Sequence, residues 1–102
     1  MTDAGAVKSA AGDVEMVEAY TLLGRVHLNR SRITAAEQAF AAALKIDPLA
    51  IGALIGNGEL FYRSGRFAEA ASRFDAAQRA DADNVLAKVG TAKTMIASRK
   101  AR

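Results

Sequence analysis

Apolar residues recur along the chain at helical spacing, three and four positions apart, rather than in the alternation typical of strands. In the stretch 34–47, Ala36, Phe40 and Ala43 share one face of a helix, and polar residues lie between them. The same pattern, interrupted by short polar turns, predicts five helices. They run over about 13–29, 34–47, 49–63, 67–80 and 85–97.

The boundaries of these helices carry residues that favour helix ends. Thr34 stands three positions before Glu37, the spacing of a capping box at the start of the second helix. Pro48, the only proline, ends that helix, because the residue before a proline avoids helical angles. Gly65 is expected to end the third helix and Asn84 to cap the fifth. Turns this short force neighbouring helices to run antiparallel, so we expect an all-α fold.

The pattern also repeats along the chain. Residues 17–50 align with residues 51–84 without a gap, at a period of 34. A helical unit of this length cannot bury its apolar face alone, so successive units must stack. Identical residues in the two units include Ala19/Ala53, Gly24/Gly58, Arg32/Arg66, Ala36/Ala70, Phe40/Phe74, Ala42/Ala76, Ala43/Ala77 and Asp47/Asp81.

This unit resembles the tetratricopeptide repeat, a helix–turn–helix motif of the same length. The family carries Leu, Gly and Tyr on its first helix, then Ala, Phe, Ala and Pro on its second. The clearest departure is His27, which stands where the family has Tyr. The first unit supplies Tyr20, Leu23, Gly24 and His27, then Ala36, Phe40, Ala43 and Pro48. The second supplies Leu54, Asn57, Gly58 and Phe61, then Ala70, Phe74, Ala77 and Ala82.

The resemblance covers about residues 17–97 and implies a short right-handed α-solenoid of antiparallel helix pairs. Because the end of such a stack must be covered, the fifth helix is expected to act as its cap. The expected parts are a flexible segment 1–12, a domain 13–98 with repeats 17–50 and 51–84 and a capping helix 85–97, and a basic tail 99–102.

Glycines inside the predicted helices need a packing reason, because glycine costs about 1 kcal/mol there relative to Ala. The resemblance places Gly24 against Ala36 of the partner helix, and Gly58 likewise in the second unit. Gly56 and Gly90 are also 34 positions apart. They either leave a smooth strip for the backbone of a ligand or allow close packing between the first helices of adjacent units.

In tetratricopeptide repeats, ligands usually lie in a concave groove lined by the first helix of each unit. Carried over by position, this groove combines an apolar strip with flanking charges, which suits an extended or helical peptide with a few apolar anchors. Part of the strip could instead pack between helices or be covered by residues 1–12. The predicted groove residues are Arg25, Leu28, Asn29, Ile55, Glu59, Tyr62, Arg63, Val89, Lys93 and Ile96.

The resemblance thus implies a non-enzymatic module that docks a protein or peptide partner, as a scaffold or assembly factor of bacterial type. The alternative is self-association, in which the repeats form a homo-oligomer or a structural spacer of a larger protein. A carboxylate clamp of the kind found in chaperone-binding members is not expected. Its five positions are held here by Thr21, Arg25, Gly56, Leu86 and Gly90, none of which matches.

Composition narrows the chemistry further. The chain has no cysteine, which excludes disulfides, zinc–thiolate sites and thiol nucleophiles. It has neither metal-ligand spacing nor a phosphate-binding loop, so no catalytic residue, metal or cofactor is predicted. The net charge of +3 is mild, with cations near helix ends, and no nucleic-acid partner is expected. No apolar run approaches the roughly 18 residues of a membrane span, and the expected location is the cytoplasm.

Overall fold

The computed structural model describes residues 2–101, with their side chains from Gly12 onward. All regular structure in these residues is helical, which confirms the all-α prediction. The first helix begins at Thr2, well before the expected start near Asp13, because Ala recurs through this stretch and favours helix. The helices are α1 (Thr2–Asn29), α2 (Ile33–Ile46), α3 (Ile51–Arg63), α4 (Phe67–Ala80) and α5 (Val85–Lys100).

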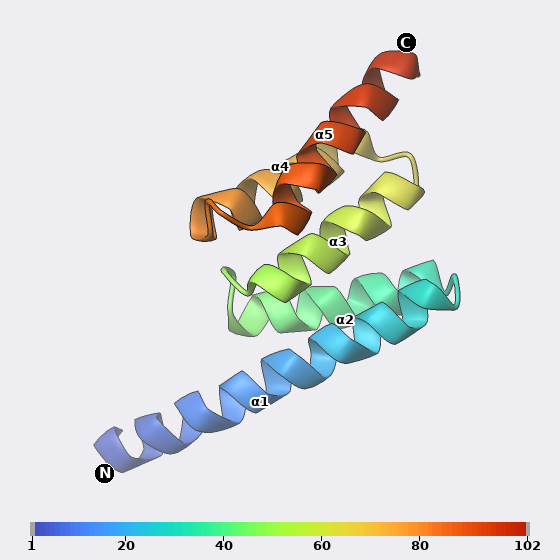
Figure 1. Ribbon diagram of the computed structural model, residues 1–102. Coiled ribbons are helices and arrows are strands. Elements are labelled where there is room, and N and C mark those ends of the chain that lie inside the picture. The colour runs from blue at the N-terminus through green and yellow to red at the C-terminus, as the bar shows by residue number, and fades with distance from the viewer. Residues whose placement is uncertain (1, 102) are drawn as a thin grey trace.

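The helices form a stack of two layers. α1, α3 and α5 lie in one layer, and α2 and α4 lie behind them in the other (Figure 1). The backbone of α1 lies against that of α3, and α3 against α5, whereas within residues 2–101 the backbones of α2 and α4 do not come as close. Helices on the inside of a curved stack lie closer together than those on the outside. The layer of α1, α3 and α5 is therefore the concave side.

Three of the four predicted helix boundaries form as expected, since α2 also ends before Pro48, at Ile46, and one does not. Asn84 caps α5, because its Oδ1 accepts a hydrogen bond from the Ala87 N–H at 3.0 Å. Gly65 follows α3 with a φ of 75°, a left-handed angle that favours glycine. The capping box at Thr34 does not form. α2 begins one residue earlier, and its N-cap residue Arg32 makes no side-chain cap hydrogen bond.

Phe40 of α2 joins the first helix pair to the second. Its side chain is fully buried, and its ring lies between Gly24 of α1 and Gly56 of α3. A Cβ atom at Gly24 would lie 2.7 Å from the ring, and one at Gly56 would lie closer still. Real Cβ atoms do not approach a neighbour within 3.0 Å, so both positions require glycine. The atoms nearest to Gly24 thus belong to the ring of Phe40, whereas the sequence-based expectation was Ala36.

The second helix pair repeats this arrangement one unit along the stack. The ring of Phe74 lies between Gly58 of α3 and Gly90 of α5, and a Cβ atom at Gly58 would lie 2.8 Å from it. Gly56 and Gly90 are thus closely packed, but the atoms nearest to each belong to the Phe ring on the second helix of the preceding unit rather than to the adjacent first helix. Fully buried alanines complete the core, namely Ala36, Ala43, Ala53, Ala70, Ala77 and Ala87.

α5 packs on α4 and α3 with one face only. Ala87, Gly90 and Thr94 are buried on that face. The opposite face is apolar as well, yet it remains open to solvent. More than half of the surface of Val85, Val89, Met95 and Ile96 is exposed.

Candidate functional site

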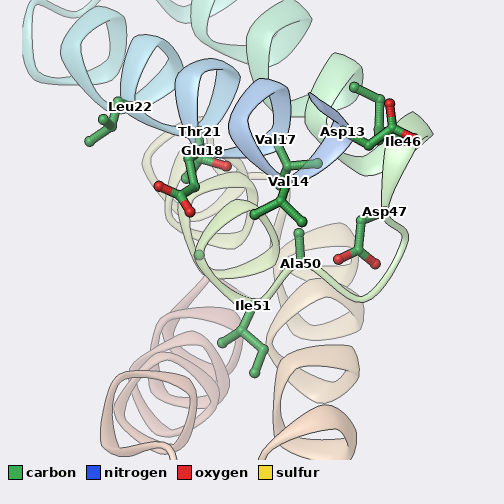
Figure 2. A pocket seen from close by; sticks show the side chains of 11 residues that line it. Asp13, Val14, Val17, Glu18, Thr21, Leu22, Ile46, Asp47, Ala50 and Ile51 are labelled. Atoms are coloured by element: carbon green, nitrogen blue, oxygen red, sulfur yellow. The ribbon is translucent and has the colours of Figure 1, made fainter. Parts of the chain in front are cut away.

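The concave side contains two adjoining hollows that share Gly52 of α3. The first, of about 590 Å³, lies between the middle of α1 and the turn that joins α2 to α3. Figure 2 shows Val14 of this helix pointing toward Ala50 across the hollow. Its lining consists of Asp13, Val14, Val17, Glu18, Thr21, Leu22, Ile46, Asp47, Ala50, Ile51 and Gly52.

The first hollow has an apolar floor and an acidic rim. Val14 on the floor is 58% exposed, although its side chain is apolar. Three carboxylates surround it, those of Asp13, Glu18 and Asp47, and neither Lys nor Arg lines the hollow. Asp47 also orders the turn, because its Oδ1 accepts the Leu49 N–H at 3.0 Å. This hollow suits an apolar side chain that has a cation beside it.

The second hollow, of about 270 Å³, lies where α1, α3 and the start of α5 meet. Leu28 and Ile55 give it apolar surface, whereas Arg25 and Arg63 bring positive charge to its wall. It therefore differs in charge from the first hollow. Its lining consists of Arg25, Leu28, Asn29, Gly52, Ile55, Gly56, Glu59, Arg63 and Leu86.

Glu59 holds this second hollow together by binding two cations. Its Oε2 accepts the Arg63 Nε–H at 3.1 Å, one turn along α3, and its Oε1 accepts the ammonium of Lys93 from α5. That ammonium also lies 4.6 Å from the centre of the Tyr62 ring, a cation–π contact. Arg63 further donates to the Leu28 carbonyl at 3.4 Å. These contacts tie all three helices of the concave layer to one another.

A family model described as the tetratricopeptide repeat matches residues 27–96, more than half of the chain. The chain belongs to the tetratricopeptide repeat family. No curated protein matches it. Tetratricopeptide repeats generally mediate protein–protein interactions, and the concave layer described above is the kind of surface that such stacks present to partners.

Other classes of site find little support in the part of the chain that the structure describes. Within residues 2–101, no helix is long and apolar enough to cross a membrane. In the same residues, no group of three or more His, Asp or Glu side chains could hold a metal ion.

Six of the ten residues predicted to line the groove lie together in the second hollow. Tyr62 and Lys93 stand beside these six, because Lys93 binds Glu59 and covers the tyrosine ring. Val89 and Ile96 line neither hollow, although their spacing places them on the same side of α5 as Lys93, and both are more than half exposed. The six residues that line the second hollow are Arg25, Leu28, Asn29, Ile55, Glu59 and Arg63.

None of the three carboxylates on the rim of the first hollow is among the ten predicted groove residues. Asp13 comes from the first part of α1, and Asp47 comes from the turn between two repeat units. Both lie outside the helix positions that define the groove of the family. Glu18 and Gly52 do occupy groove positions of the repeat. These two residues were the part of the sequence that could have indicated this hollow.

The pKa of Glu59 links the second hollow to the stability of the fold. Partial burial raises this pKa, but the hydrogen bonds and charges of Lys93 and Arg63 outweigh that effect, so the pKa lies below its ordinary value. A carboxylate whose pKa is lower in the folded state stabilises the fold above its unfolded pKa. That stabilisation is lost as the pH falls through the folded pKa.

We therefore expect Glu59→Gln to reduce the acid sensitivity of the protein. Between about pH 6 and about pH 3, the urea midpoint should fall further for the wild type than for the variant. Circular dichroism during urea titration measures both midpoints. Glu15→Gln, which changes an exposed carboxylate outside the ion pairs of the described residues, is the control. An equal acid shift in wild type and Glu59→Gln would contradict this role of Glu59.

Proposed function

We propose that this protein is a non-enzymatic interaction module that docks a partner peptide along the concave layer of its repeats. The observation that carries the proposal is the pair of adjoining hollows, which share Gly52 and form a groove across α1 and α3. Apolar surface runs through both hollows, so a peptide with two apolar anchors could bury one in each. A scaffold or assembly factor uses such a surface, since docking requires no chemical step.

The two ends of the groove differ in charge. The first hollow has three carboxylates and no cation, whereas the second has Arg25 and Arg63 with Lys93 close behind. Glu59 neutralises only part of that positive charge, because it pairs with Arg63 and Lys93 but not with Arg25. A partner segment with a basic end and an acidic end therefore fits in one orientation. For a groove this small we expect a dissociation constant on the order of micromolar.

We expect Arg63→Glu to weaken docking of such a segment by at least about tenfold, because the acidic end would meet a carboxylate instead of a guanidinium. The probe is a fluorescein-labelled peptide with two leucine anchors between a lysine end and a glutamate end. Fluorescence anisotropy gives its dissociation constant. A second peptide, with glutamines in place of the charged residues, should bind more weakly.

Arg79→Glu is the matched control for this experiment. Arg79 also stands near the end of its helix, and it pairs with an acidic residue one turn earlier, Asp75, at 3.0 Å. It lines neither hollow. Arg79→Glu should leave the affinity for the charged peptide unchanged. Equal loss in the two variants, or equal binding of the charged and glutamine peptides, would refute docking in the groove.

A further inference from the structure

α1 carries an exposed apolar face that is left largely uncovered by the residues whose side chains the structure describes. α1 is the outermost helix at one end of the stack (Figure 1), and the residues of this face are exposed there. We call it the outer face of α1. The exposed fractions of its large residues lie between 45% and 60%. It consists of Met16, Ala19, Leu22, Leu23 and Val26.

The repeat shows what these positions do elsewhere in the fold. In α3, the equivalents of Ala19 and Val26 are Ala53 and Leu60, and both are fully buried. In α5 the equivalents are Ala87 and Thr94, and they are buried too. On both helices the preceding helix pair covers these positions. On α1 the same positions form a stacking surface that lacks a partner.

Leu22 rules out a preceding repeat packed in the same way. Its equivalents are Gly56 and Gly90, each of which lies against the Phe ring of the preceding unit. There a single Cβ atom would already approach the ring within 3.0 Å. A leucine side chain needs far more space, so a helix pair that placed a Phe ring over α1 would clash with it. The outer face of α1 is suited to a different occupant.

The charged residues along the edge of this face have the opposite signs and the spacing needed to pair with those of a second copy. Glu18 and Arg25 lie seven positions apart, which places them on one side of α1, two turns from each other. Neither makes an ion pair with another described residue. We propose that two copies of the chain pair through this face, with their α1 helices antiparallel about a two-fold axis near Thr21.

This antiparallel register satisfies both the apolar and the charged positions. Met16 faces Val26 of the second copy, and Leu22 meets its own counterpart near the axis. Glu18 then lies beside Arg25 of the second copy, and symmetry forms the same ion pair twice. A parallel two-fold pair would instead place the charged edges of the two helices on opposite sides, so that Glu18 would not lie beside Arg25 of the second copy. The register therefore follows from the spacing of Glu18 and Arg25.

The exposed apolar face of α5 is not suited to pair with a second copy of itself in this way. The exposed apolar stripe of α5 contains Val89 and Ile96. Lys88 and Lys93 border this stripe on opposite sides. Because α5 contains no acidic residue, an antiparallel pair of these stripes would form no ion pair like that between Glu18 and Arg25. Self-association is thus assigned to α1 and not to α5.

Sedimentation equilibrium on the full chain tests the pairing. The wild type should form a dimer whose population rises with concentration. Glu18→Arg and Arg25→Glu should each raise the dimer dissociation constant by at least about tenfold, because symmetry repeats every charge reversal. The double variant, which exchanges the two charges, should restore the dimer. Such rescue is expected of direct pairing and not of a general loss of structure.

Leu23→Lys and Val89→Lys supply a second, independent comparison. Both replace an exposed apolar residue by lysine, but only Leu23 lies on the outer face of α1. Leu23→Lys should abolish the dimer with helicity unchanged by circular dichroism, and Val89→Lys should leave it intact. A monomeric wild type at about 1 mM, the reverse order of these two variants, or failure of the charge exchange to rescue would overturn the proposal. No peptide is present in this experiment, so its failure would leave docking in the groove unaffected.

Discussion

Replacing Phe40 by Ala should lower the free energy of unfolding by about 3–5 kcal/mol, the range for emptying a buried aromatic position. The ring is fully buried, and it contacts glycines of two successive units. Its loss would therefore open a cavity between the helix pairs rather than within one of them. Small domains have only about 5–15 kcal/mol of stability in total, so this variant should be close to unfolding at room temperature.

Urea denaturation followed by circular dichroism measures this loss. Phe40→Leu should cost less, because leucine refills part of the cavity between the two glycines. Val14→Ala is the control for removing apolar atoms outside the core, since Val14 is 58% exposed. If Phe40→Ala and Val14→Ala had equal midpoints, the ring could not be the contact that joins the two units.

Much of the fold follows from local pattern. Helical periodicity, short turns and the 34-residue period predict the five helices and their stacking, because each depends on residues close together in the sequence. The groove positions of α1 and α3 follow as well. Once the repeat sets which side of the helix is buried, residues such as Arg25 and Glu59 must lie on the concave side.

Contacts between units are harder to predict from this sequence. A glycine at position 24 indicates that something approaches closely, but it does not say whether the neighbour is Ala36 or the ring of Phe40. The acidic rim depends on where the turn between units comes to lie beside α1, which local pattern does not determine. Leu22 is a different case. It occupies the position of Gly56 and Gly90, so the sequence already marks α1 as unlike the other two helices of its layer.

Gly56→Ala should destabilise the protein by about 1–3 kcal/mol, even though alanine is the better helix former. The added methyl group would lie within 3.0 Å of the Phe40 ring, and the ring, buried on all sides, has little room to move away. Gly12→Ala is the matched control, because it makes the same change in a helix with no atom within 4 Å of the new methyl group. It should stabilise the protein by up to about 1 kcal/mol.

A double-mutant cycle assigns the effect of Gly56→Ala to the ring. If the methyl group clashes with Phe40, then Phe40→Leu should cost less in the Gly56→Ala background than in the wild type, because the smaller side chain relieves the overlap. Gly12→Ala should show no such coupling with Phe40→Leu. Additive effects at positions 56 and 40 would mean that the ring does not restrict Gly56. If Gly56→Ala instead stabilised the protein and abolished binding of the charged peptide, Gly56 would be part of the peptide-binding groove.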